Sequence, residues 1–145
     1  MSVPSATVVA DAAVLISAAL GRSTPVIREV AQLRILVTTD RAIEEARRRI
    51  SIGLRRPEVL LILERILEDV TVVPVERLEP LLVESGNYLR DAVASRNGSV
   101  SDAHLLALAR DAGADIWSAD RDFAGTGVAS WSTPNLLRGL SEPQD

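Results

Sequence analysis

Short apolar runs alternate with longer amphipathic segments along most of the chain. A run of four or five apolar or β-branched residues fits a strand covered on both faces, whereas apolar positions three and four apart fit a helix. We expect strands at Thr7–Ala10, Ile35–Thr38, Val70–Val73, Ala114–Ser118 and Val128–Trp131. We expect helices at Ala12–Leu20, Pro25–Leu33, Arg41–Ile52, Glu58–Asp69, Leu78–Ala94 and Thr133–Leu140, and one between Ser101 and Gly113. This alternation predicts an α/β fold, a three-layer α/β/α sandwich around a mainly parallel sheet.

Residues with known capping preferences stand at several predicted helix ends. Ser101 can cap the helix that follows it, and Gly113 can close the same helix. Either Thr39 or Asp40 can cap the helix that begins at Arg41. These signals support the proposed order of elements.

The composition fits one globular domain. The 145 residues, 47% of them hydrophobic, suffice for a sizeable core, and we expect a single domain over residues 1–140 with a frayed tail at 141–145. The aromatic fraction of 3% requires a core of Val, Leu, Ile and Ala. The absence of cysteine excludes disulfides and thiolate metal sites. No apolar run reaches the ~20 residues of a membrane span, so we expect a cytoplasmic protein.

All 16 basic residues are arginine, in a chain whose formal net charge is −4. This acidic balance argues against a general nucleic-acid binder. Five arginines nevertheless lie close together in the sequence, namely Arg47, Arg48, Arg49, Arg55 and Arg56. Because guanidinium groups make forked contacts with phosphate, these five form a candidate anion-binding patch. The alternative is a solvated helix face without a ligand.

Acidic residues stand where a parallel sheet would bring them to one edge. Asp11 follows the first predicted strand, and Asp120 lies beyond the fourth. Asp102 lies in the first turn of the helix that leads into the fourth strand, and Glu44 or Glu45 lies one turn into the helix after the second. Ligands of open parallel sheets bind beyond the carboxyl ends of the strands. The pattern therefore predicts three or four carboxylates in one cleft.

Several carboxylates in one pocket repel one another unless a cation compensates their charge. Mg²⁺ and Mn²⁺ prefer oxygen ligands and keep water molecules, which suits phosphodiester hydrolysis. A single histidine, His104, and the lack of cysteine argue against zinc.

Each acid also has a simpler interpretation. Asp11 can be a helix cap, and Asp102 can be an anion at the positive end of a helix. Asp120 and Asp122 can be turn residues, and Glu45 can be one more solvated helix residue. His104, in the same turn as Asp102, fits a surface or capping residue better than a base. The joint placement of these residues, rather than any single one, favours a site.

The chain resembles the PIN-domain family of metal-dependent ribonucleases, and is similar to the toxin component of VapBC-type toxin–antitoxin systems. Three stretches carry the resemblance: VVADAAVLISAAL, TTDRAIEEARRRI and SVSDAHLLALARDAGADIWSADRDFAG. Their order is strand–Asp–helix, then a helical Glu, then an Asp that opens a helix, then Ser-x-Asp-x-Asp-Phe. The resemblance spans nearly the whole chain and implies a PIN-like fold.

The resemblance also implies a site. The family's acidic quartet, which binds Mg²⁺ or Mn²⁺, matches Asp11, Glu45, Asp102 and Asp120. Asp122 matches a further acidic position, and Ser118 matches the small hydroxyl residue before the strand-end Asp. Glu45 is preferred to Glu44 because the family's Glu comes two residues after an apolar one, here Ile43. The arginine patch would hold the backbone of single-stranded RNA.

The activity implied by the resemblance is endoribonucleolytic hydrolysis of RNA phosphodiesters. Many bacterial members are toxins of type II toxin–antitoxin pairs, so the implied partners are the RNA substrate, a small antitoxin protein and a second copy in a homodimer. The chain departs from the family at Asp11-Ala12-Ala13, where a hydroxyl residue and an amide usually follow the first Asp. Those groups would orient the acid or its water. Their absence favours the alternative, a PIN-like binding or scaffold module with weak or no activity.

Other α/β classes fit less well. A receiver domain needs a pair of acids after the first strand and a late Lys, and a phosphatase with a nucleophilic Asp needs a second Asp where Ala13 stands. The chain also lacks a phosphate-binding P-loop. A metal-dependent ribonuclease is therefore the main hypothesis.

Overall fold

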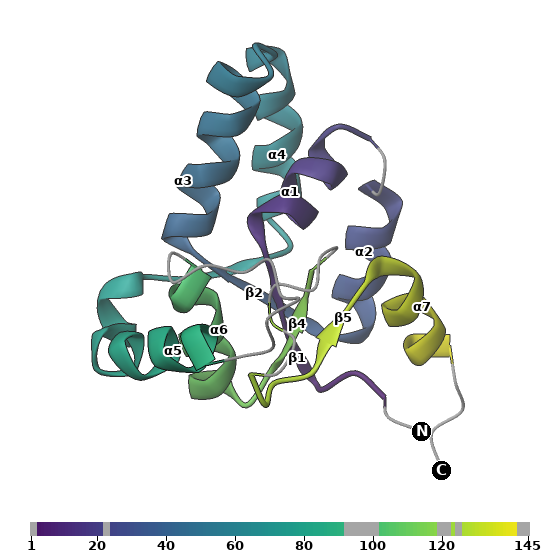
Figure 1. Ribbon diagram of the computed structural model, residues 1–145. Coiled ribbons are helices and arrows are strands. Elements are labelled where there is room, and N and C mark those ends of the chain that lie inside the picture. Colours follow the sequence, from purple (N-terminus) through teal and green to yellow (C-terminus); the bar gives the residue numbers. More distant parts are fainter. Residues whose placement is uncertain (1–2, 22–23, 92–101, 119–122, 124–125, 142–145) are drawn as a thin grey trace.

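Five strands form one parallel sheet in the order β3-β2-β1-β4-β5 (Figure 1). The computed structural model describes residues 3–21, 24–91, 102–118, 123 and 126–141. The strands are β1 (Thr7–Ala10), β2 (Ile35–Thr39), β3 (Thr71–Val73), β4 (Asp115–Trp117) and β5 (Ser130–Trp131). Each pair of neighbouring strands runs parallel, so the carboxyl ends of the strands lie at one edge of the sheet. The predicted α/β fold is confirmed.

Seven α-helices connect and follow these strands in the described part of the chain. They are α1 (Ala12–Ala19), α2 (Thr24–Leu33), α3 (Asp40–Arg48), α4 (Leu60–Leu67), α5 (Glu79–Asp91), α6 (Ala103–Ala112) and α7 (Thr133–Ser141). A π-helical turn at Arg49–Gly53 continues α3, and single 3₁₀ turns at Pro57–Val59 and Val75–Leu78 precede α4 and α5. Every predicted helix is present among the described residues, with boundaries that differ by a few residues, while the predicted end at Ala94 and the predicted cap Ser101 lie outside them.

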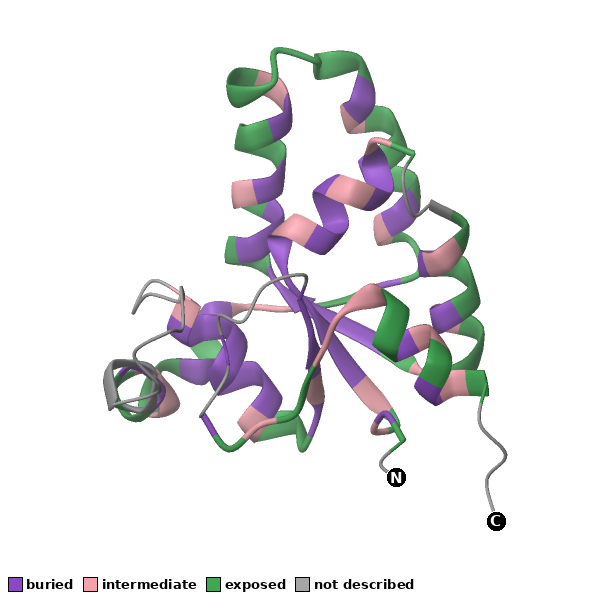
Figure 2. Ribbon diagram, turned by 45° about the vertical axis from the view of Figure 1, so that its right-hand side comes forward, coloured by how far each residue is buried: buried purple, intermediate pink, exposed green. Residues whose placement is uncertain are grey.

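The helices form a layer on each face of the sheet (Figures 1 and 2). Val8 and Ala10 of the central strand β1 pack in a cluster with side chains from α1 to α4 and α7. Val9, which points to the opposite face, packs in a second cluster that is built mainly from α6. Because both faces of β1 are covered, its side chains are buried along the strand, as the apolar run predicts.

The core is aliphatic around two fully buried aromatic side chains, Trp117 and Phe123. The indole nitrogen of Trp117 donates a hydrogen bond to Thr133 Oγ1 at 2.9 Å, which satisfies its polar atom inside the core. Asp115, at the start of β4, is satisfied in a similar way. Its carboxylate accepts hydrogen bonds from the Ser5 backbone nitrogen (3.0 Å) and from Trp131 Nε1 (2.9 Å). This acid fastens the N-terminal segment to the sheet, far from the carboxyl ends of the strands.

Candidate functional site

Asp11 lies at the carboxyl edge of the sheet, directly after β1. Ala10 pairs with Trp117 in the neighbouring strand, and the Asp11 backbone nitrogen donates to the Trp117 carbonyl at 3.2 Å. Ser118, which follows β4, therefore lies beside Asp11, and its own backbone nitrogen donates to the Trp131 carbonyl at 3.0 Å. Asp11 and Ser118 are thus adjacent at this edge, and Asp120, the other acid predicted there, lies outside the described residues.

The carboxylate of Asp11 is buried and caps α1. The side chain is 6% exposed, and its Oδ1 accepts a hydrogen bond from the Val14 backbone nitrogen at 2.8 Å. The capping role considered from the sequence is therefore present. Ala12 stands where the family usually has a hydroxyl residue, and it is buried in the second apolar cluster, the one built mainly from α6. A backbone N–H orients the acid here, so a hydroxyl at position 12 is not needed for that purpose.

One stripe of α3 faces a cavity of about 430 Å³. Thr39 caps the helix, since its Oγ1 accepts from the Ala42 backbone nitrogen at 3.0 Å. Residues three and four apart lie on one side of a helix, and the cavity-lining residues of α3 follow this spacing: Arg41, Glu44, Glu45 and Arg48. Glu45 is half-buried whereas Glu44 is exposed. The lower exposure of Glu45 agrees with the preference for it as a ligand.

Asp102 and His104 reach the same cavity from the start of α6. Asp102 is the residue that precedes the helix, and its side chain makes no capping hydrogen bond to it. Ala103, the next residue, belongs to the apolar cluster that also contains Ala12. The first residues of α1 and α6 therefore belong to the same apolar cluster, which also contains Val9 of β1.

His104 is buried against α3. It is 3% exposed, and its Nδ1 lies 2.8 Å from Thr39 Oγ1. Burial, and to a lesser extent the positive charge of Arg41, lowers the pKa of His104 to about 4, although the negative charge of Asp40 partly opposes this. The ring is therefore neutral at pH 7, and the cavity holds an uncharged imidazole beside its carboxylates.

The described residues supply only part of the predicted acidic quartet. Glu45 and Asp102 line the cavity, and Asp11 lies at the sheet edge, outside the set of lining residues. Asp120 and Asp122 lie outside the described residues. Within the described part, no three His, Asp or Glu side chains come close enough together to hold a metal ion. The donors that are placed are carboxylate oxygens, which is the chemistry that Mg²⁺ and Mn²⁺ prefer.

The five arginines of the predicted patch have different surroundings. Arg48 lines the cavity. Arg47 pairs with Glu64 of α4 at 2.8 Å, and Arg56 pairs with Glu58 at 3.2 Å, both at exposed positions. Arg49 and Arg55 are also exposed. The sequence did not single out Arg41, although its place one helical turn before Glu45 is a usable signal.

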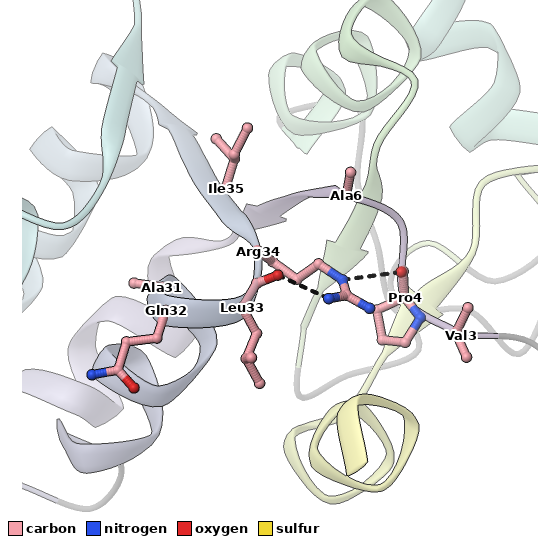
Figure 3. Close-up of a pocket in the computed structure, with 8 residues that line it drawn as sticks. All are labelled: Val3, Pro4, Ala6, Ala31, Gln32, Leu33, Arg34 and Ile35. Atoms are coloured by element: carbon pink, nitrogen blue, oxygen red, sulfur yellow. Dashed lines mark hydrogen bonds between the residues drawn. The ribbon is translucent and has the colours of Figure 1, made fainter. Parts of the chain in front are cut away.

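A cavity of about 540 Å³ lies at the opposite end of the sheet (Figure 3). Its lining is mostly apolar and includes Val3, Leu33 and Ile35. Among the described residues that line it, Arg34 is the charged one, and its guanidinium donates to the carbonyls of Pro4 (3.2 Å) and Leu33 (2.8 Å) (Figure 3). The described residues of this lining offer no acid or nucleophile. The smaller cavity at α3 and α6 holds carboxylates and lies at the end of the sheet where Asp11 lies, so it is the candidate site.

Comparisons with known proteins give one matching family model and two solved structures with a similar fold. The family model described as PIN domain matches residues 9–141. The fold is similar to VapBC2 from Rickettsia felis, solved bound to a DNA fragment from its promoter, with a TM-score of 0.71 and 9% identity over 87% of this chain and 98% of the other. It is also similar to PAE2754 from Pyrobaculum aerophilum, with a TM-score of 0.65 and 18% identity over 93% of this chain and 89% of the other. No curated protein matches the sequence significantly.

Proposed function

The chain belongs to the PIN domain family, and from that premise we propose that it is an endoribonuclease that depends on Mg²⁺ or Mn²⁺ and hydrolyses RNA phosphodiesters. PIN domains are generally nucleases, and the two solved structures support the fold. One observation carries the proposal. Carboxylates from α3 and α6 line a single cavity at the end of the sheet where Asp11 lies.

The proposed ligands are Asp11, Glu45, Asp102 and Asp120, with Asp122 as a further acid and Ser118 as a supporting hydroxyl. Glu45 and Asp102 have the required oxygen donors in the cavity, and the Val14 N–H already orients Asp11. A divalent ion held by such residues supplies activation of water and neutralisation of charge on the phosphate.

The charges of the cavity suit a cation together with a phosphodiester. Among the described residues of the lining, three carboxylates and two guanidinium groups, beside a neutral imidazole, leave a net charge of −1. This balance attracts a divalent cation, and with the cation bound the site becomes positive and attracts a phosphate. Arg41 and Arg48 flank the acids and can hold phosphate oxygens. The exposed arginines Arg47, Arg49, Arg55 and Arg56 are proposed to hold neighbouring parts of the RNA backbone.

The direct test is cleavage of a mixed pool of single-stranded RNA with Mg²⁺ or Mn²⁺ present. We expect Asp102→Asn to reduce cleavage by two or more orders of magnitude while the circular dichroism spectrum stays unchanged. Asp111→Asn is the matched control, because Asp111 is an exposed acid of the same helix and lies outside the cavity. Cleavage that continues at full rate in EDTA, or that Asp102→Asn does not affect, contradicts the proposal.

We further propose that the chain is the toxin of a type II toxin–antitoxin pair, located in the cytoplasm, with a small antitoxin and a second copy of itself as partners. Apolar side chains at the end of the α3–α4 hairpin support a protein partner, since Ile52 and Leu61 are 71% and 75% exposed. Among the described residues, none of the helices is long and apolar enough to cross a membrane. Growth arrest on expression, relieved by Asp102→Asn, tests the toxin role, and ultracentrifugation tests the homodimer.

The second candidate is a PIN-like binding or scaffold module. The departure at Asp11-Ala12-Ala13 favours it, because no hydroxyl or amide follows the acid to orient a water molecule, although the Val14 N–H orients the acid itself. Metal binding separates the two proposals. A wild-type chain that binds no Mn²⁺ with RNA present supports the scaffold, and saturable binding supports the enzyme.

A further inference from the structure

His104 connects the two helices that carry the cavity's acids. Its ring is on α6, two residues after Asp102, and its Nδ1 lies 2.8 Å from Thr39 Oγ1. Thr39 in turn caps α3, the helix of Glu45. The ring is nearly fully buried, yet it lines the cavity. The roles proposed for the acidic quartet and for the arginines do not explain why a buried histidine lines this cavity.

The hydrogen bonds of Thr39 determine which nitrogen of the ring carries the proton. Thr39 Oγ1 already accepts a hydrogen bond from the Ala42 backbone nitrogen at 3.0 Å. The other partner of this hydroxyl in the described residues is His104 Nδ1, and we assign the hydroxyl proton to that contact, with Nδ1 as the acceptor. An Nδ1 that accepts leaves the proton on Nε2. A doubly protonated ring would also carry a proton on Nε2, so the assignment does not depend on the charge of the ring.

Nε2 is therefore the polar atom with which His104 faces the cavity. Nδ1 is occupied by Thr39, and no other hydrogen bond of the ring is found in the described part of the chain. The other described residues of the lining carry carboxylates or guanidinium groups. A neutral N–H donor differs from both, because it can bind an anionic oxygen without repelling a divalent cation.

We propose that His104 is a phosphate-binding residue whose Nε2–H, fixed by Thr39, donates to a non-bridging oxygen of an RNA phosphodiester in the cavity. This inference rests on the proposed function, since it assigns a role within the same site. Thr39 is the positioning residue, because its one hydroxyl caps the Glu45 helix and orients the imidazole.

The tautomer can be measured without RNA and without cleavage. His104 is the sole histidine, so its two ring nitrogens give an unambiguous pair of signals in a long-range ¹H–¹⁵N spectrum. At pH 7 we expect a protonated Nε2 and an accepting Nδ1. Thr39→Val should shift the equilibrium towards the other tautomer, and Thr39→Ser, which keeps the hydroxyl, should restore the wild-type spectrum. A wild-type ring with its proton on Nδ1 overturns the inference.

The phosphate contact is tested by binding of a single-stranded RNA oligonucleotide in Ca²⁺, which resembles Mg²⁺ in its preference for oxygen ligands. The amide oxygen of Asn lies near the position of Nδ1, so His104→Asn keeps the bond to Thr39 and loses the donor. The amide nitrogen of Gln lies near Nε2, so His104→Gln keeps the donor. We expect binding to fall about tenfold or more in His104→Asn, as for loss of a hydrogen bond to a charged group, and to fall much less in His104→Gln.

The outcomes separate this inference from the proposed function. Equal binding of RNA by wild type and His104→Asn overturns the phosphate contact, whether or not the wild type cleaves RNA. A wild type that binds RNA through His104 but cleaves none refutes the nuclease proposal and leaves the contact in place. Calcium titration of each variant without RNA serves as the control, and we expect unchanged metal affinity in His104→Asn.

Discussion

Replacement of His104 by Gln should remove the loss of folding stability at low pH that comes from protonation of this histidine. Burial of the ring, with a smaller contribution from Arg41, lowers the pKa of His104 from 6.5 to about 4. Between these values the unfolded chain binds a proton at this position that the folded chain does not bind. The free energy of unfolding of the wild type therefore falls as the pH falls from 6.5 to about 4. Below a pH of about 4 the ring is protonated in both the folded and the unfolded chain, and no further stability is lost through His104.

The magnitude follows from the two pKa values. A fall from 6.5 to about 4 corresponds to about 3 kcal/mol, at about 1.36 kcal/mol for each pH unit. About 2 kcal/mol of this is lost by pH 5, because the unfolded chain is then almost fully protonated at this site and the folded chain is not. Whole domains are stable by only about 5–15 kcal/mol, so the effect is a measurable fraction of the total.

The assay is urea unfolding at pH 7, 6, 5 and 4 in EDTA, followed by the fluorescence of the buried Trp117. The quantity of interest is the difference in unfolding free energy between wild type and His104→Gln at each pH. Carboxylates common to both chains cancel in this difference. We expect it to change by about 3 kcal/mol from pH 7 to pH 4, to the disadvantage of the wild type. Parallel pH profiles for wild type, His104→Gln and His104→Asn would refute the assignment of a buried, neutral imidazole.

Three further predictions concern stability, measured by urea unfolding at pH 7. Gly139→Ala should lower the free energy of unfolding by about 1–3 kcal/mol, because the new Cβ would lie 2.9 Å from Pro4 Cδ. In its control, Gly53→Ala, the new Cβ has no atom within 4 Å, so stability should change by less than about 0.5 kcal/mol. Asp11→Ala should cost about 1 kcal/mol through loss of the α1 cap, and Asp11→Asn, which keeps an acceptor, should cost much less. Trp117→Phe should cost about 1–3 kcal/mol, since it leaves a void and removes the bond to Thr133. Equal stabilities within any of these comparisons would contradict the contact that it tests.

The order of strands and helices could be predicted because burial on both faces leaves a clear pattern in the sequence. Val8, Val9 and Ala10 are apolar since β1 is central, and the predicted strand coincides with the observed one. The end of α3 was less predictable. Its apolar spacing continues to Ile52, but after Arg48 the hydrogen bonds change to the π pattern, with the Leu54 nitrogen bound to the Arg49 carbonyl at 2.8 Å. Periodicity does not report such a change.

The acids proposed for the site stay predictions from the sequence, and the residues around them were harder to anticipate. Thr39 and Asp40 were equal candidates for the α3 cap, and only tertiary contacts separate their roles. Thr39 bonds to Ala42 and His104, while Asp40 accepts from the Val75 backbone nitrogen at 2.9 Å. His104 was interpreted as a surface or capping residue because its spacing from Asp102 carries no information about Thr39.

Adjacent arginines illustrate a second limit. Arg47 and Arg48 are neighbours in the sequence, but successive residues of a helix point in directions about 100° apart. One therefore pairs with Glu64 of α4 and the other lines the cavity. A cluster in the sequence was thus a weaker guide than the helical stripe that joins Arg41 to Arg48. Asp120 and Asp122 remain predictions, because they lie outside the described residues.

The central claim is that these carboxylates form a site for a divalent metal ion, and calorimetric titration with Mn²⁺ tests it most directly. The proteins to compare are the wild type, the Asp11→Asn/Asp102→Asn double variant and the Asp111→Asn control. We predict saturable binding by the wild type and the control, and its loss in the double variant with the fold preserved. No binding by the wild type even with RNA present, or equal binding by all three proteins, would contradict the claim.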